Sequence, residues 1–355
     1  MPERPGILHA PADVGGNAYG LSRAERELGL RSDVAVFAPG PFGYGFDVDL
    51  HAGADQPLWR RFARRAAFLR RAAREYDVFH FNFGLTLLQV RQLGVVVDEL
   101  ALLKRAGKTV LVTYQGCDVR PKASCPCRHP ECFAGARYRQ PAAERALRLA
   151  DRVFFLNPDL RHWLPGATFV PYASVDARRI EAAPLPEREE LLVAHAPSDR
   201  QVKGTRHVEE AVEKLRREGH PVRLDLIEGV TRDEVLARVT EADVVVDQLL
   251  IGWYGAFAVE AMALGRPVLA YIREEEPEDN PFGTSLPIVR TTAAALADDL
   301  LALAENRQRR LELGAAGRRF AEEHHDPRRI ARTVLEGIAD LTPEQEPAPA
   351  ARARR

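Results

Sequence analysis

Apolar and polar positions follow two alternating patterns along most of the chain. Short apolar runs predict buried strands, and stretches with apolar residues three or four apart predict amphipathic helices. The predicted strands are 6–10, 33–38, 77–83, 108–114, 152–156, 167–171, 191–195, 222–228, 244–246, 268–272 and 288–290. The predicted helices are 17–28, 59–76, 85–106, 142–150, 207–218, 231–241, 256–264, 292–304, 307–323 and 327–341. Strands that alternate with helices indicate an α/β fold with parallel sheets.

The alternation stops once and then restarts. Residues 176–190 are rich in proline and charge, which is typical of a linker. We therefore expect two doubly wound, Rossmann-like domains that face each other across a cleft, at 1–178 and 185–324, and a disordered tail at 343–355. Ligands of such sheets bind beyond the carboxyl ends of the strands, so the loops after the strands should line the cleft.

One strand–loop–helix–strand unit, residues 243–272, carries the clearest chemistry. Asp247 ends its first strand, and a loop with two glycines leads into a helix that is apolar on every side except at Glu260. Gly265 and Pro267 terminate that helix. A buried carboxylate is costly unless a polar group meets it, and helix N–H groups after a glycine loop commonly hold phosphate. The unit suits a nucleotide, with pyrophosphate on the N–H groups and ribose hydroxyls on Glu260.

Composition narrows the class of protein. The chain has 355 residues, 46% of them hydrophobic and 28% charged, and its net charge is −1. This length favours about two domains with ordinary cores. A near-zero net charge argues against general binding to nucleic acid or to membrane surfaces. No apolar run reaches 18 residues and the N-terminus lacks an apolar leader, so we expect a soluble cytoplasmic protein.

A second glycine loop follows the first predicted strand. Gly15 and Gly16 lie between that strand and a helix, which is the arrangement of a phosphate- or sugar-facing turn. The residues do not form the full dinucleotide fingerprint, so a simple tight turn is an equal alternative.

Basic residues gather near the start of the predicted helix 207–218. They are Arg200, Lys203, Arg206 and His207. The helix dipole disfavours cations at this end, so the cluster predicts that an anion joins them. A solvated basic face is the alternative.

All four cysteines, Cys117, Cys125, Cys127 and Cys132, lie within 16 residues, with His129 among them. In a cytosolic protein such clustering favours a structural zinc over disulfides. The spacing is not that of a standard zinc knuckle, so free thiols and disulfides stay open as alternatives.

The residues of the central unit resemble the donor site of retaining, nucleotide-sugar-dependent glycosyltransferases of the GT-B fold, in the large group 1, family-four-like class. The matching segment is GWYGAFAVEAMALGRPVLAY. By this resemblance Glu260 holds the ribose, and the donor is also bound at the helix start, by Gly255, Ala256, Phe257 and Ala258. The family has a further glutamate eight residues before Glu260, where this chain has Gly252. Asp247 is then a candidate to contact the donor sugar in its place.

Three other segments extend the resemblance over nearly the whole chain. HAPSDRQVKGT is similar to a phosphate clamp, which implies catalytic roles for Arg200 and Lys203. TYQGCDV is similar to a segment in which Asp118 is kept and Gln115 replaces a histidine. VPYASVD resembles the crossing between the domains. The resemblance also implies that a last helix, at about 325–342, returns to the first domain. Asp118 is assigned to catalysis, and Gly15, Gly16, Asn17 and Gln115 to the acceptor side.

The resemblance implies transfer of a sugar from a nucleotide-sugar donor to a hydroxyl of a glycan, a lipid-linked or a small-molecule acceptor, with retention, as in cell-envelope or other glycan biosynthesis. No nucleic acid is expected as a partner, and a lipid-linked acceptor would bring the enzyme to a membrane surface. No metal or other cofactor is expected for catalysis, because the Asp-x-Asp string at 47–49 falls in a predicted solvated loop. A sugar-nucleotide epimerase and a catalytically degenerate nucleotide-sugar binding protein are the alternatives.

Overall fold

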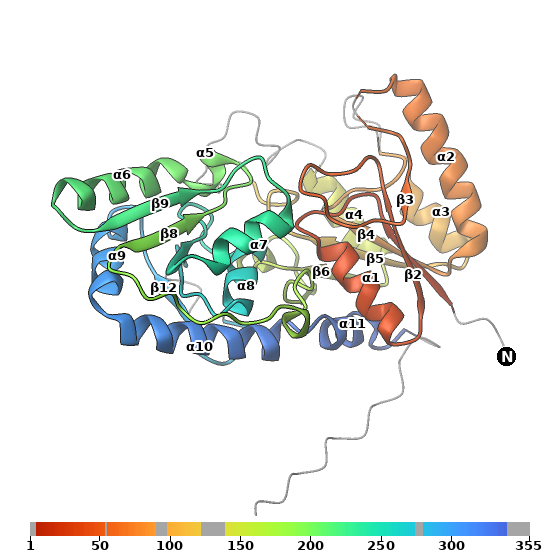
Figure 1. Ribbon diagram of the computed structural model, residues 1–355. Coiled ribbons are helices and arrows are strands. Elements are labelled where there is room, and N and C mark those ends of the chain that lie inside the picture. The colour runs from red at the N-terminus through yellow and green to blue at the C-terminus, as the bar shows by residue number, and fades with distance from the viewer. Residues whose placement is uncertain (1–4, 54, 90–97, 122–138, 274–279, 339–355) are drawn as a thin grey trace, which may run out of the picture.

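The computed structural model describes residues 5–53, 55–89, 98–121, 139–273 and 280–338, which form two α/β domains side by side (Figure 1). In the first domain the strands are β1 (Gly6–Ala10), β2 (Arg31–Val36), β3 (Val48–Asp49), β4 (Val78–Asn82), β5 (Thr109–Tyr114), β6 (Arg152–Phe155) and β7 (Thr168–Phe169). Its helices are α1 (Asn17–Glu27), α2 (Leu58–Glu75), α3 (Glu99–Arg105), α4 (Arg139–Leu149) and the 3-10 turn η3 (Pro158–His162).

The second domain follows a mostly extended segment that contains the 3-10 turn η4 (Ala177–Arg179). Its strands are β8 (Leu191–His195), β9 (Val222–Leu226), β10 (Val244–Val246), β11 (Val268–Ala270) and β12 (Ile288–Arg290). Its helices are α5 (Arg200–Lys203), α6 (Thr205–Arg217), α7 (Arg232–Thr240), α8 (Ala256–Ala263), α9 (Leu296–Glu305) and α10 (Arg307–His324). The last described helix is α11 (Pro327–Leu335).

Within the described residues the strands build one seven-stranded and one five-stranded sheet, and every pairing is parallel. The strand orders are β3-β2-β1-β4-β5-β6-β7 and β12-β11-β10-β8-β9. In the first sheet the order reverses between β1 and β4, and in the second between β8 and β10. The crevices at such reversals are where open α/β sheets bind ligands.

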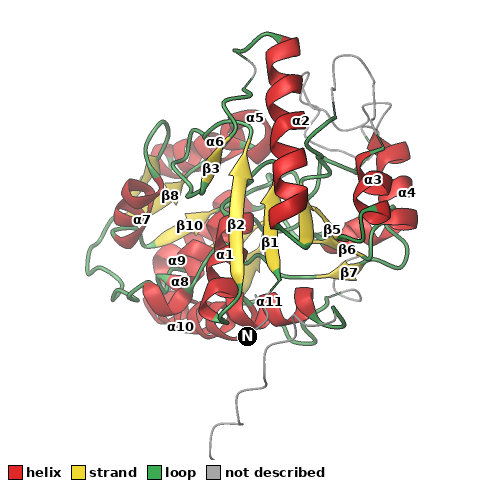
Figure 2. Ribbon diagram, turned by 90° about the vertical axis from the view of Figure 1, so that its right-hand side faces the viewer, coloured by secondary structure: helices red, strands yellow, loops and turns green. Residues whose placement is uncertain are grey.

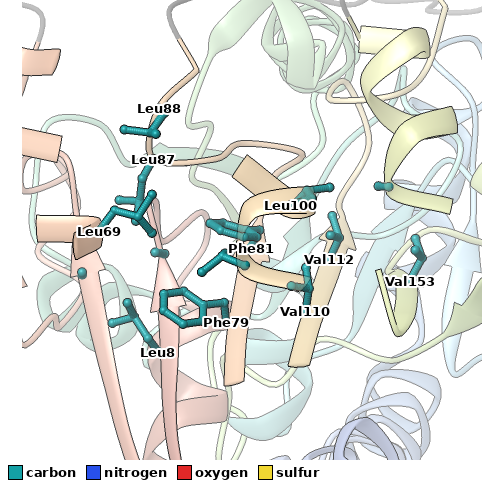
Figure 3. Close-up of a cluster of buried hydrophobic side chains, with 14 of the residues drawn as sticks. Leu8, Leu69, Phe79, Phe81, Leu87, Leu88, Leu100, Val110, Val112 and Val153 are labelled. Carbon is teal, nitrogen blue, oxygen red and sulfur yellow. The ribbon is translucent and has the colours of Figure 1, made fainter. Parts of the chain in front are cut away.

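Apolar side chains cover both faces of the first sheet. On one face, Leu8, Phe79 and Phe81 of the strands pack with Leu69 of α2 and Leu100 of α3 (Figure 3). On the other face, the buried cluster includes Ile7 and Leu111 of the strands, Leu21 of α1 and Ile330 of α11. Figure 2 shows α2, α3 and α4 on one side of this sheet. A sheet covered on both faces explains its almost continuous apolar strands.

The chain returns to the first domain at its end. Helix α10 ends at His324, and α11 then packs against α1 beneath the first sheet (Figure 1). The guanidinium of Arg152 on β6 donates to the carbonyls of Thr333 (2.8 Å) and Glu336 (2.7 Å) at the end of this helix. These carbonyls have no partner within the helix, so the arginine both satisfies them and matches the helix dipole.

The predicted helix 85–106 is wrong over its first part. Residues 85–89 form no helix, 90–97 lie outside the described residues, and the helix begins only at Glu99. The carboxylate of Glu99 accepts from the N–H groups of Leu87 (3.2 Å) and Leu88 (2.7 Å). Both leucines are buried in the core. Their apolar pattern therefore reflects a buried loop whose N–H groups are satisfied by a side chain instead of by helical carbonyls.

Smaller differences occur elsewhere. Residues 48–49, predicted as solvated loop, pair with β2 as β3, and Asp47 accepts from the N–H of Val34 (2.8 Å). The described helix α11 ends at Leu335, earlier than predicted, and Gly337 follows with a positive φ of 74°. The predicted tail, 343–355, lies outside the described residues. Among the helices that are described, none is both long and apolar enough to cross a membrane.

Candidate functional site

Lys203 and Asp247 meet at the reversal of strand order in the second sheet. Lys203 follows β8, and Asp247 stands at the carboxyl end of the adjacent strand β10. The Lys203 ammonium lies 3.1 Å from Asp247 Oδ1 and 2.7 Å from the side-chain oxygen of Gln248. Asp247 is 1% exposed, and its charge is met by the lysine. A cation is therefore fixed where the topology predicts a ligand.

The N-terminus of α8 borders the same cation. The N–H of Gly255 donates to Asp247 Oδ2 (2.5 Å), and a Cβ at this glycine would lie 3.1 Å from the Lys203 ammonium. The N–H of Ala258 is used by the carbonyl of Gly255 (3.1 Å). The donors left to a ligand are thus those of Ala256 and Phe257, because a helix's first N–H groups have no intrahelical acceptor.

Glu260 is buried one turn further along α8, as its sequence context predicts. Its exposure is 5%, and Arg232 at the start of α7 donates to Oε1 at 2.5 Å. Burial raises the pKa of Glu260, although the neighbouring Arg232 opposes that shift. A cavity of about 220 Å³ lies beside Arg232, between α1, α7 and residues 173–180, the crossing segment that joins the two domains. The polar partner that a buried carboxylate needs is therefore supplied by the chain itself.

The loop after β1 reaches across to α8 from the first domain. A Cβ at Gly15 would lie 3.7 Å from the Cβ of Ala256. Gly15 and Gly16 have φ values of 66° and 72°, which only glycine adopts without strain. A Cβ at Gly16 would come within 2.7 Å of the Tyr44 ring. Burial raises the pKa of Tyr44, and the negative charge of Glu260 adds to this shift.

Asp13, in the same loop, is a titratable group at the domain boundary. Its Oδ1 accepts from the N–H of Ala18 (2.9 Å), and within the described structure its buried Oδ2 has no hydrogen-bond partner. Burial raises the pKa of Asp13 to about 6. The carboxyl therefore changes charge near pH 6, within the loop that touches α8.

The remaining predicted first-domain residues serve mainly to shape the loops. Asn17 Oδ1 accepts from the N–H of Ala173 (2.8 Å), which ties α1 to the crossing segment. Asp118 is 2% exposed and accepts from the N–H groups of Gln115 (2.8 Å) and Gly116 (2.6 Å), closing the turn after β5. The side-chain nitrogen of Gln115 is buried without a hydrogen-bond partner among the described residues. Gln115 therefore has a side-chain donor that the described residues leave unused.

Gly252 stands where the resemblance expects a carboxylate, and Arg273 occupies the space above it. Gly252 has a φ of 84°, and a Cβ there would lie 2.6 Å from Nε and 2.9 Å from Cδ of Arg273. Arg273 donates to Asp159 of the first domain (3.0 Å). Asp159 also receives two hydrogen bonds from buried Arg120, at 2.8 and 2.9 Å. The glycine therefore makes room for an ion pair between the domains.

The basic cluster near α6 does not need an outside anion, contrary to the sequence-based argument. Arg200 pairs with Glu209 and with Glu228 (3.1 Å), and it is half exposed. Arg206 and His207 both contact Glu210, at 3.1 and 3.5 Å. For Arg206 and His207 the carboxylate lies four and three residues further along the helix, a spacing that the sequence pattern also contained. Only Lys203 of the four faces the start of α8.

Only one of the four cysteines of the predicted zinc cluster lies in the described part of the chain. Cys117 lies in the turn after β5 and is partly buried, whereas Cys125, Cys127 and Cys132 lie outside the described residues. Within the described ranges no group of three or more His, Cys, Asp or Glu is arranged to hold a metal ion. The zinc hypothesis stays a prediction.

Sequence reasoning missed five residues of this region: Asp13, Tyr44, Asp159, Arg232 and Arg273. Each lies in a loop or at a helix start that follows a strand, so the rule that such segments line the cleft was the available signal. Tyr44 also lies between two glycines, Gly43 and Gly45, in the loop after β2. The sequence did not show which of these segments approach each other in the fold.

No family model matches the chain, and no curated protein matches it in sequence. Solved structures do match. A sucrose-phosphate synthase from Thermosynechococcus elongatus has a TM-score of 0.61 and 19% identity, over 92% of this chain and 96% of that one. Anabaena HepE in complex with UDP-glucose has a TM-score of 0.62 and 16% identity, over 94% and 98%. A protein described as a UDP-N-acetylglucosamine 2-epimerase from Listeria monocytogenes has a TM-score of 0.57 and 18% identity, over 94% and 95%.

At these identities the likeness establishes the fold, and a synthase and an epimerase share it, so the chemistry rests on the site. The predicted architecture of two doubly wound parallel-sheet domains is confirmed, and the chain has the GT-B fold of these proteins.

Proposed function

We propose that the chain transfers a sugar from a nucleotide-sugar donor to an acceptor hydroxyl, with retention of anomeric configuration. One observation carries this proposal: the Lys203 ammonium is fixed by Asp247 beside the N-terminus of α8, with Glu260 a turn deeper. The cation and the helix N–H groups suit a diphosphate, and the carboxylate suits ribose hydroxyls. HepE, which has this fold, was solved with UDP-glucose.

In this reaction the acceptor oxygen bonds to the anomeric carbon while the bond from that carbon to the diphosphate breaks. The acceptor proton passes to an oxygen of the leaving phosphate. The protein's part is to stabilise the charge that develops on the diphosphate. We assign this part to Lys203 and to the N–H groups of Ala256 and Phe257. Arg200 joins them only after leaving Glu209 and Glu228, so it has a lesser share.

Donor binding and turnover are measured together to test the proposal. The full chain is incubated with a panel of nucleotide sugars, and released nucleotide, epimerised donor and bound donor are followed by chromatography and calorimetry. Release of nucleotide with one donor supports a transferase, and retention is then read from the anomeric NMR signal of the product. An epimer without release identifies an epimerase, and binding without turnover in the presence of cell-extract acceptors identifies a binding protein.

Lys203→Met tests the residue that carries the proposal. Loss of a preorganised charge at a leaving group should lower turnover by about 10²-fold or more. Lys214→Met is the matched control, because Lys214 is an exposed lysine on α6 that pairs with Asp298 at 3.4 Å, away from α8. Equal turnover in the two variants refutes the assignment of Lys203.

A further inference from the structure

Helix α2 presents an unusual surface at the outer edge of the first domain (Figure 1, Figure 2). One side of the helix is buried against the sheet through Phe68, Leu69 and Ala72. Arg65 is buried on that side as well, where it donates to the carbonyl of Ala52 (3.0 Å) and stacks over the ring of Phe37. The packed side fixes the helix, so the opposite side is held towards solvent.

The charged groups on the solvent side of α2 are almost all cationic. The helix contains seven arginines and one acidic residue, Glu75, which is its last. The arginines that point into solvent are Arg60, Arg64, Arg70, Arg71 and Arg74. For Arg70 and Arg74 no ion pair is formed with any described residue. In a chain whose net charge is −1, such segregation creates a local positive field that the total does not reveal.

Apolar side chains stand next to these charges at the start of the helix. Trp59 is 69% exposed, and Leu58 and Phe62 are about 40% exposed. The described chain has eight exposed large apolar side chains. Three are these residues at the start of α2, and three more, Val14, Phe42 and Phe46, lie in the loops after β1 and β2. Solvent-exposed apolar groups that gather in one region mark an interaction surface.

Topology places this surface at the mouth of the cleft. β3 runs parallel to β2, so the chain that leaves it starts α2 at the carboxyl edge of the first sheet. The Gly15 loop at that same edge meets α8 of the second domain. A partner that binds Trp59 and its neighbours therefore lies at the rim of the candidate site.

We propose that the start and solvent side of α2 dock the protein onto an anionic lipid bilayer. Arginine side chains pair with lipid phosphates, and tryptophan with neighbouring apolar residues enters the interface between headgroups and acyl chains. Leu58 favours lipid over nucleic acid, because an aliphatic side chain adds nothing to stacking on bases. Docking is a property of this surface alone and does not rest on the proposed sugar transfer.

Flotation of the full chain with vesicles tests the proposal. Vesicles of phosphatidylcholine alone are compared with vesicles that contain about one third phosphatidylglycerol, at low and high salt. The protein should float with the anionic vesicles at low salt, and the binding should weaken at high salt. Binding to neither kind of vesicle, or equal binding to both, overturns the proposal.

Two pairs of variants connect the binding to α2. Arg70→Gln with Arg74→Gln should lower partitioning about 10- to 30-fold, since each basic residue near an anionic surface contributes about fivefold. The control pair, Arg216→Gln with Arg217→Gln, removes two exposed arginines from α6 and should change nothing. Trp59→Gln should lower partitioning about 5- to 10-fold, against Leu102→Gln on α3, whose side chain is 49% exposed.

All four variants change exposed side chains, and their circular dichroism and melting temperature verify folding. If the α2 variants and their controls bind vesicles equally, the surface is not the docking site. Tighter binding to a single-stranded RNA than to anionic vesicles, lost in the arginine pair, assigns the surface to nucleic acid instead and overturns the proposal.

Discussion

Replacing Gly252 by alanine should destabilise the protein for two separable reasons. The φ of 84° lies in the left-handed region, where a side chain costs about 1–2 kcal/mol. The new Cβ would also lie 2.6 Å from Nε of Arg273, so the arginine must move and release Asp159. Asp159 keeps two hydrogen bonds from Arg120, so this loss is at the low end for a charged bond, about 1.5 kcal/mol. The expected total is about 3 kcal/mol.

A double-mutant cycle with Arg273→Ala separates the two terms. In that background the space above residue 252 is empty and the ion pair is already lost, so Gly252→Ala should cost only the backbone term. The difference, a coupling of about 1.5 kcal/mol, is measured by urea unfolding followed by fluorescence and circular dichroism. Gly219→Ala is the matched control for the backbone term, because Gly219 has a φ of 90° and no atom lies within 4 Å of the position that its Cβ would take.

An equal cost of Gly252→Ala with and without the Arg273 side chain would refute the proposed competition for space. A cost no larger than that of Gly219→Ala would refute it too. The same reasoning implies that Gly252→Glu, which supplies the carboxylate that the resemblance expects, destabilises the chain instead of restoring a contact.

Two further predictions concern pH. The folded-state pKa of Asp13 is raised to about 6, so its contribution to stability is present below pH 4 and is lost as the pH rises through 6. Asp13→Asn should remove a change in the free energy of unfolding of up to about 3 kcal/mol between pH 4 and 7, measured by urea unfolding. An unchanged dependence of this free energy on pH counts against a buried carboxyl. The folded-state pKa of His325 is lowered to about 4 by burial, so its contribution is full above pH 6.5 and is lost as the pH falls towards 4. His325→Gln should reduce the loss of unfolding free energy between pH 6.5 and 4 by up to about 3 kcal/mol in the same measurement. The pKa of His195 is also lowered to about 4, so the part of the pH dependence that comes from His195 should remain. A pH dependence as steep as that of the unchanged protein contradicts the prediction.

Where local pattern decides the structure, the sequence was sufficient. The strands at 191–195, 244–246 and 288–290 have the predicted bounds, because short apolar runs between turn residues leave few alternatives. Glu260 is buried as predicted. In each case the deciding residues lie within a few positions of each other.

Where the decision lies between distant segments, the sequence was not sufficient. Arg232 meets Glu260, 28 positions away, because α7 and α8 pack together. Arg273 covers Gly252 and reaches Asp159, 114 positions away, because the two domains touch there. Likewise the net charge of −1 for the whole chain gives no sign of the arginines on α2. That these arginines face solvent together depends on which side of the helix is packed. A short stretch of sequence cannot predict such contacts between distant segments.

The return of α11 to the first domain has a consequence for how the protein is made. Ile330 and Val334 complete a cluster that includes Ile7 and Leu21, so the first domain lacks part of its core until the last described residues exist. At a synthesis rate of about 5–20 residues per second, the stretch between α1 and α11 takes roughly 15–60 s to emerge. By the end of that interval the second domain is complete in sequence, whereas the face of the first sheet that α11 covers still lacks that helix. The core of the first domain can therefore be completed only after the second domain has been synthesised, because α11 supplies part of it.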